Sequence, residues 1–179
     1  MNRLTALNPE TASGKTKTLF DAIHSKMGKV PNMMRTMGHS PALLEGYLGL
    51  SGALGGGTLG AKLGEQLALA VSEANSCDYC VAAHSFIAEK MVRMDAATIA
   101  ASRQISPIDA KTDAALTFAK HLVEKRGLVS EADVADVRAA GYTEGEVGEI
   151  VGHVALNTLT NYFNNAAKPT LDFPVPAAL

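Results

Sequence analysis

Helix-forming residues and helix-capping residues run through the whole chain. Ala, Leu, Glu, Lys and Met are frequent, and the apolar–polar alternation typical of β-strands is scarce. Ser40 precedes Pro41, and Thr143 is followed three residues later by Glu146, two patterns typical of helix N-termini. Gly28 follows a helical segment as a C-cap. These signals predict an all-α protein: a compact bundle of about eight helices without a sheet.

The length and charge of the chain narrow its class further. A chain of 179 residues suits a single domain, residues 1-179, with a substantial core. Only 19% of the residues are charged, and the net charge is -2, so nothing indicates binding to nucleic acid or to an anionic membrane. Low charge favours a homo-oligomer that buries part of its surface.

No segment of the sequence reads as a membrane span or a secretion signal. No apolar run approaches the length of a bilayer, and the first residues lack the apolar core of a signal peptide. We therefore expect a cytoplasmic protein without a membrane partner.

The strongest chemical feature is a pair of cysteines three residues apart, Cys77 and Cys80, followed by His84. These are the two cysteines of the chain. On a helix, all three side chains fall within a narrow arc, and His84 lies one turn after Cys80. A helix N-terminus stabilises a thiolate, and a second thiol nearby permits reversible disulfide chemistry. The motif indicates a redox-active cysteine pair.

Other interpretations of the motif are weaker but open. The cysteines could be buried structural residues beside a core histidine, because the same arc continues through apolar residues. A zinc site lacks a fourth local ligand and a second CxxC motif. A thioredoxin fold would need a strand before the motif, and none is predicted.

The segment from Glu65 to His84 resembles the signature of alkyl hydroperoxidase D-like proteins, in the carboxymuconolactone decarboxylase superfamily. Glu65 lies twelve residues before Cys77, as in that signature. Lys29-Val30-Pro31-Asn32, His39-Ser40-Pro41, Thr160-Asn161-Tyr162-Phe163-Asn164 and Asp172-Phe173-Pro174 resemble flanking parts of its peroxidase-related members. The resemblance covers the chain from about Lys29 to Pro174.

The resemblance implies an all-helical hydroperoxidase D-like fold, peroxidase activity and a proton relay. Carried over by position, the relay runs from Glu65 through His84 to a cysteine. Tyr79 stands where some members have a second histidine, and we include it among the candidate catalytic residues although a phenol is a poor base. Helical periodicity alone places Glu65 opposite the apolar stripe of its helix, on a solvated face. The resemblance also implies assemblies built from dimers, up to hexamers.

We predict a thiol-dependent peroxidase that reduces hydrogen peroxide or organic hydroperoxides. We expect Cys80 to attack the peroxide, because His84 is one turn away from it, and Cys77 to resolve the sulfenic acid as a disulfide. An external dithiol or protein thiol would then reduce the disulfide. No metal or organic cofactor is expected, because sulfur carries the two electrons.

Three alternatives come from other classes of function. A disulfide reductase or redox sensor would use the same cysteine pair without peroxidase activity. A ring-opening decarboxylase, like the namesake of the superfamily, is a further alternative, but its chemistry does not require a pair of cysteines. A non-catalytic helical binding module would leave the thiols unreactive.

Overall fold

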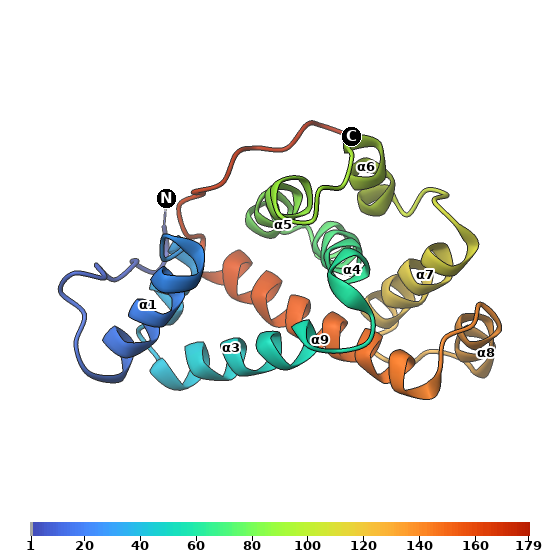
Figure 1. The fold of residues 1–179 in the computed structure, drawn as a ribbon, viewed down its shortest axis with the longest axis horizontal. Helices are drawn as coiled ribbons and strands as arrows, with labels where there is room; N and C mark the ends of the chain where they lie inside the picture. The colour runs from blue at the N-terminus through green and yellow to red at the C-terminus, as the bar shows by residue number, and fades with distance from the viewer. Residues whose placement is uncertain (1) are drawn as a thin grey trace.

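The structure, a computed structural model, describes residues 2–179 and forms nine α-helices over that range, without a strand. The all-α prediction is confirmed, with one helix more than the predicted number of about eight. The helices are α1 (Gly14–Met27), α2 (Asn32–Met37), α3 (Pro41–Gly55), α4 (Gly60–Ala74), α5 (Asp78–Lys90), α6 (Ala96–Gln104), α7 (Ala110–Glu124), α8 (Glu131–Ala139) and α9 (Glu144–Ala167). Figure 1 shows their arrangement.

Local capping chemistry explains several of these boundaries. The Ser40 side chain accepts a hydrogen bond from the Leu43 amide at the start of α3, as its position predicts. Thr143 and Glu146 form a reciprocal capping box at the start of α9. Gly28 ends α1 with a φ of 72°, a left-handed conformation that glycine adopts without a steric penalty.

Two other helix starts depend on the residues just before them. Ser76 lies in a turn with a φ of 50°, and Cys77 is the N-cap of α5. The Asp109 side chain accepts a hydrogen bond from the Thr112 amide at 2.9 Å and caps α7.

The centre of the fold is α4, which packs against α5, α6, α7 and α9 (Figure 1). Every residue from 66 to 72 is buried. A single apolar stripe was expected on this helix, and that expectation is wrong because neighbours cover the helix on several sides. Even Leu69 and Ser72, which lie near the predicted solvated face, are fully buried.

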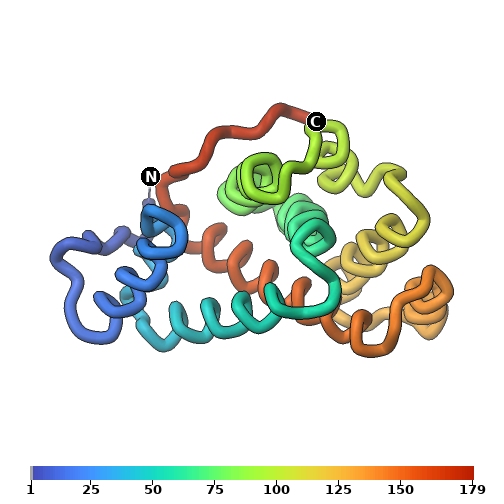
Figure 2. The backbone as a smooth tube through the Cα atoms, in the orientation of Figure 1, coloured from blue at the N-terminus to red at the C-terminus, as the bar shows by residue number. Residues whose placement is uncertain are grey.

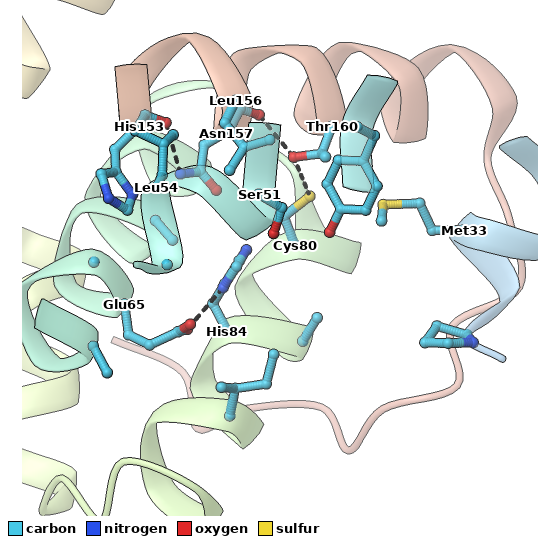
Figure 3. A pocket seen from close by; sticks show the side chains of 18 of the residues that line it. Met33, Ser51, Leu54, Glu65, Cys80, His84, His153, Leu156, Asn157 and Thr160 are labelled. Atoms are coloured by element: carbon cyan, nitrogen blue, oxygen red, sulfur yellow. Dashed lines mark hydrogen bonds and ion pairs between the residues drawn. The ribbon is translucent and has the colours of Figure 1, made fainter. Parts of the chain in front are cut away.

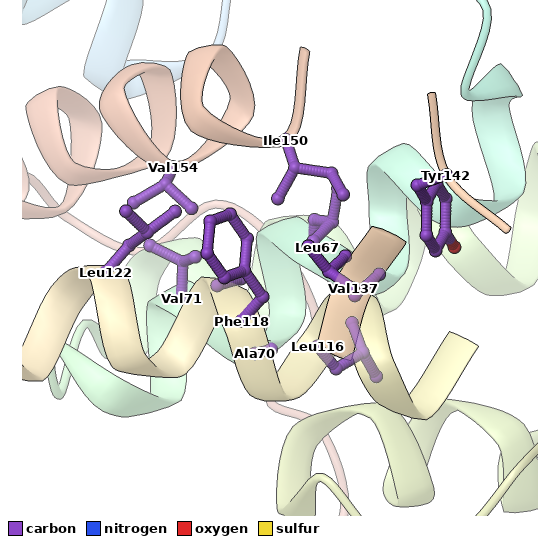
Figure 4. Packing of buried hydrophobic residues seen from close by; sticks show 12 residues of the cluster. Leu67, Ala70, Val71, Leu116, Phe118, Leu122, Val137, Tyr142, Ile150 and Val154 are labelled. Atoms are coloured by element: carbon purple, nitrogen blue, oxygen red, sulfur yellow. The ribbon is translucent and has the colours of Figure 1, made fainter. Parts of the chain in front are cut away.

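The largest apolar cluster joins α4 to α7, α8 and α9, as Figure 4 shows for Leu67, Phe118, Val137 and Ile150. A second cluster holds the side chains of α1, α2 and the start of α3 together with both cysteines. The candidate site therefore lies where the N-terminal helices meet α5, in a region separate from the largest cluster.

The segment after α9 is extended, as its prolines predict, and crosses over α5 toward α6 (Figure 2). It is held by side chains from the body of the fold. Tyr79 Oη donates to Asp172 at 2.6 Å, and Arg103 donates to the carbonyl of Ala177 at 2.7 Å. Phe173 is thereby positioned against the ring of Tyr79, edge to face.

Over residues 2–179, no helix is long and apolar enough to cross a membrane.

The dense packing around α4 leads to a stability prediction. Leu67 is fully buried in the largest cluster, so Leu67→Ala leaves a cavity and should lower the free energy of unfolding by about 2–5 kcal/mol. Leu128 is 83% exposed, and Leu128→Ala should change the free energy of unfolding by less than about 0.5 kcal/mol. Urea denaturation followed by circular dichroism measures both. Equal losses in the two variants would contradict the central role of α4.

Candidate active site

The cysteine pair lies at the sharp corner between α4 and α5. The Cys77 amide donates to the Ser72 carbonyl at 2.9 Å, which closes the end of α4. Cys77 then caps α5, and Cys80 follows in its first turn. Both cysteines are buried and both are free thiols. Cys80 and His84 thus lie one turn apart on α5, whereas Cys77, predicted on the same helical arc, lies just before the helix in an extended conformation.

The sulfur of Cys80 is surrounded by polar groups from α9. Asn164 Nδ2 donates a hydrogen bond to Cys80 Sγ at 3.1 Å, and Thr160 Oγ1 lies 3.9 Å from the same sulfur. Asn164 and Thr160 are themselves buried. A buried amide donor favours the charged form of a thiol, because it replaces hydration that burial removes.

These surroundings give the two thiols opposite acidities. The hydrogen bond from Cys77, then the charge of His84 and the amide of Asn164, outweigh burial and lower the pKa of Cys80 to about 6. The same bond to Cys80, together with burial, raises the pKa of Cys77. Cys80 is therefore the thiolate at neutral pH, and Cys77 is the protonated donor beside it.

The predicted glutamate–histidine pair is formed. Glu65 Oε2 lies 2.8 Å from His84 Nδ1, across the interface of α4 and α5. Burial lowers the pKa of His84, but the charge and hydrogen bond of Glu65 and the charge of Cys80 outweigh it, so the pKa is raised. With Nδ1 on Glu65, the ring lies between that carboxylate and Cys80 (Figure 3). Glu65 is only partly buried, and this places it at the edge of a pocket rather than on a solvated face.

A pocket of about 240 Å³ opens beside these groups (Figure 3). Cys80, His84, Glu65 and Tyr79 all line it, and Cys77 does not. The remaining walls are largely apolar, with Met33, Met34, Leu54, Ala68, Ile87, Leu156 and Phe173 among them. The pocket can hold a small organic molecule against Cys80, while Cys77 approaches the same sulfur from within the protein.

Tyr79 is held by other groups. Its hydroxyl donates to Asp172 and accepts from the Met33 amide at 3.1 Å. Burial and then the bond to Asp172 raise its pKa, so the phenol keeps its proton. The bonding of this hydroxyl ties the C-terminal segment and α2 to the wall of the pocket.

The polar face of α9 was not predicted as part of the site. Five buried polar side chains recur at helical spacing on this helix: His153, Asn157, Thr160, Asn161 and Asn164. Burying uncompensated polar groups is costly, so such a stripe inside an apolar helix is the sequence signal that indicates a site. His153 on this face lines the pocket, and burial lowers its pKa.

Two further pocket residues, Tyr47 and Ser51 on α3, gave no sequence signal. A lone tyrosine and a lone serine in a helix resemble many others, and only the packing of α3 against the pocket distinguishes them.

Within residues 2–179, no group of three or more His, Cys, Asp or Glu side chains is arranged to hold a metal ion.

Several solved structures have a fold similar to that of this chain. An uncharacterized peroxidase-related protein from Silicibacter sp. TM1040 is 24% identical, with 94% of this chain and 92% of that chain covered and a TM-score of 0.80. The alkylhydroperoxidase AhpD core of an uncharacterized peroxidase-related protein from Ralstonia eutropha JMP134 is also 24% identical, with 97% and 92% covered and a TM-score of 0.81.

A third similar structure is the debrominase Bmp8, solved as a cysteine-to-alanine variant in complex with 2,3,4-tribromopyrrole. It is 21% identical, with 96% of this chain and 92% of that chain covered and a TM-score of 0.82. At these identities, the three structures establish the fold alone.

The sequence of the region that holds the site is similar to a known family. Residues 41–124 match the carboxymuconolactone decarboxylase family, and this stretch includes Glu65, both cysteines and His84. The predicted resemblance is confirmed: this stretch is similar to that family, and the fold is similar to that of an alkylhydroperoxidase AhpD core. No curated protein matches the chain.

The unequal acidities of the two thiols can be measured by alkylation. Only the thiolate reacts, so the rate at Cys80 should have its midpoint near the pKa of about 6 and fall at lower pH. Cys77→Ala removes the largest stabilising contact and should move this midpoint to higher pH, whereas Cys77→Ser retains a donor and should move it less. Iodoacetamide labelling followed by mass spectrometry gives both profiles. An unchanged midpoint in Cys77→Ala would contradict the role of the Cys77 thiol.

Proposed function

We propose that the protein is a thiol-dependent peroxidase that reduces small organic hydroperoxides or hydrogen peroxide. The observation that carries this proposal is the position of Cys80. Its sulfur has a lowered pKa, lines a largely apolar pocket beside the His84–Glu65 pair, and is hydrogen-bonded by a second thiol that does not line the pocket.

The proposed first step uses Cys80 as the nucleophile. Its thiolate attacks one peroxide oxygen, a sulfur–oxygen bond forms, the oxygen–oxygen bond breaks, and the leaving alkoxide takes a proton from His84 to become an alcohol. Sulfur loses two electrons and the peroxide gains them. Glu65 supports this role because its charge and hydrogen bond favour the protonated imidazole.

The cycle then closes through Cys77. Its thiol attacks the sulfenic acid of Cys80, a disulfide forms, and water leaves. An external dithiol or protein thiol reduces this disulfide and is itself oxidised, which returns both cysteines to thiols. The cycle converts one hydroperoxide and one dithiol into one alcohol, one water and one disulfide.

Three other functions would give different reactions: the disulfide reductase and the binding module considered from the sequence, and a debrominase such as the similar structure. A disulfide reductase would react with small disulfides and not with peroxide. A debrominase would release bromide from a brominated pyrrole, with an external dithiol as the reductant. A binding module would do neither.

Stopped-flow mixing of the reduced protein with hydrogen peroxide or cumene hydroperoxide tests the proposal. We expect the fast loss of two thiols per chain and turnover when a dithiol is present. In Cys77→Ser, one sulfenic acid should form at Cys80 and persist, since no resolving thiol remains. In Cys80→Ser, the first reaction should be lost. Dimedone trapping followed by mass spectrometry locates the oxidised residue.

The outcomes separate the hypotheses. Oxidation of Cys77 at the wild-type rate in Cys80→Ser would reverse the two roles. If the thiols react with neither peroxide but reduce small disulfides, the disulfide reductase replaces the peroxidase hypothesis. If they react with neither peroxide but the protein releases bromide from the bromopyrrole, the debrominase replaces it. His84→Ala should slow the first step most near neutral pH.

We also propose that the protein forms a homo-oligomer. Val151, Ala155, Leu159 and Tyr162 form an exposed apolar stripe along α9, and Tyr162 is 62% exposed. Such a stripe gains free energy when a second copy covers it.

Light scattering should therefore give the mass of a multimer at micromolar concentration. Tyr162→Glu should shift the mass toward the monomer because it places a charge in the stripe. Leu128→Glu, at an exposed site elsewhere, should not. A monomeric wild-type protein would contradict the proposal.

A further inference from the structure

The proposed cycle leaves two polar residues of the pocket without a role. Tyr47 and Ser51 are four residues apart on α3 and so lie on one face of that helix. Both line the pocket that also exposes Cys80, Glu65 and His84. In Figure 3, Ser51 lies beside Cys80 in the middle of the site. Helix α3 thus supplies the pocket with hydroxyl groups, while α5 supplies the nucleophile.

The environment of Tyr47 keeps its hydroxyl protonated. Burial, then the charges of Cys80 and Glu65, raise the pKa of Tyr47 to about 12, against a hydrogen bond with Ser51. The phenol is therefore a neutral donor at working pH, close enough to the thiolate and the carboxylate to sense both charges.

The bonding of Tyr47 differs from that of Tyr79. The Tyr79 hydroxyl gives its proton to a carboxylate, Asp172, at 2.6 Å. The Ser51 hydroxyl lies one helical turn after Tyr47, lowers the pKa of Tyr47, and can donate as well as accept. If Ser51 donates to the Tyr47 oxygen, the phenolic proton is free to bond with a molecule in the pocket.

The attack of a thiolate on a hydroperoxide needs such a donor. As the oxygen–oxygen bond breaks, negative charge develops on the leaving oxygen. A donor already fixed in a water-poor pocket stabilises that charge more than water does. His84 is held by Glu65 through Nδ1 and supplies the proton, and a second donor can share the charge before that proton arrives.

We propose that the Tyr47 hydroxyl is a catalytic group that donates a hydrogen bond to the leaving oxygen of the hydroperoxide, and that Ser51 positions it. This assignment rests on the proposed peroxidase function. The overall step is unchanged: the sulfur–oxygen bond forms, the oxygen–oxygen bond breaks, the leaving oxygen receives its proton from His84, and Tyr47 retains its own.

The test compares two proteins that both carry Cys77→Ser, one with the native Tyr47 and one with Tyr47→Phe. Without the Cys77 thiol, only the first step is observed. The oxidants are tert-butyl hydroperoxide, whose leaving group is a strongly basic alkoxide, and peracetic acid, whose leaving group is a weakly basic carboxylate. We expect a slowing of roughly 100- to 1,000-fold with the hydroperoxide, the scale of losing one donor to a developing oxyanion, and little slowing with the peracid.

Two controls isolate the hydroxyl. Tyr142→Phe removes the hydroxyl of a tyrosine that packs in the largest apolar cluster, away from the pocket, and should leave both rates unchanged. Alkylation of Cys80 by iodoacetamide in Tyr47→Phe should stay within about twofold of wild type, since a departing iodide needs no hydrogen bond. Ser51→Ala should show a weaker version of the same dependence on the leaving group and serves as the second variant if Tyr47→Phe does not fold.

Each result decides the assignment. If Tyr47→Phe slows the reactions with the two oxidants equally, or slows alkylation as much as oxidation, Tyr47 only shapes the pocket. If it slows neither oxidation, Tyr47 does not contact the reacting oxygens. Either result overturns this inference while the proposed function stands. If the Cys77→Ser protein with its native Tyr47 reacts with neither oxidant, the proposed function fails, and the role of Tyr47 fails with it.

Discussion

A negatively charged sulfur in a largely apolar pocket must be stabilised from several sides, and this requirement organises the structure around Cys80. Burial alone would favour the neutral thiol. The opposing groups are the thiol of Cys77, the charge of His84 and the amide of Asn164. Cys77 caps α5 and His84 lies on it, whereas Asn164 lies on α9, so the acidity of Cys80 depends on how those two helices pack.

The polar face of α9 would be costly without that packing. The amide nitrogens of two buried asparagines find acceptors there: Asn161 donates to Ser72 at 3.2 Å, and Asn164 donates to Cys80. The same face brings His153 to the other side of the pocket, where burial lowers its pKa and keeps it neutral. One helix therefore provides donors to the sulfur and a wall for the substrate.

The position of α4 explains why one carboxylate can act inside the protein. Neighbouring helices cover α4, and Glu65 lies on the turn just before its fully buried section, at the edge of the pocket. There it pairs with His84 while remaining partly accessible. Within the buried stretch 66–72 of α4, a glutamate would lie among largely apolar neighbours, at a high cost. Glu73, just beyond that stretch, is partly exposed and pairs with Arg103.

Local patterns in the sequence predict the helices, most of their caps, and the placement of Cys80 and His84 one turn apart on the same helix, with Cys77 at its start. These depend on residues a few positions apart. Periodicity alone misplaced Glu65, and the resemblance to a known family was needed to recognise it. The tertiary structure decided the rest: that Cys80 rather than Cys77 faces the pocket, that Asn164 reaches its sulfur, and that Tyr47 lies near the reacting groups. Asn164 is 84 residues from Cys80, and contacts across such separations depend on how whole helices pack, which no local pattern records.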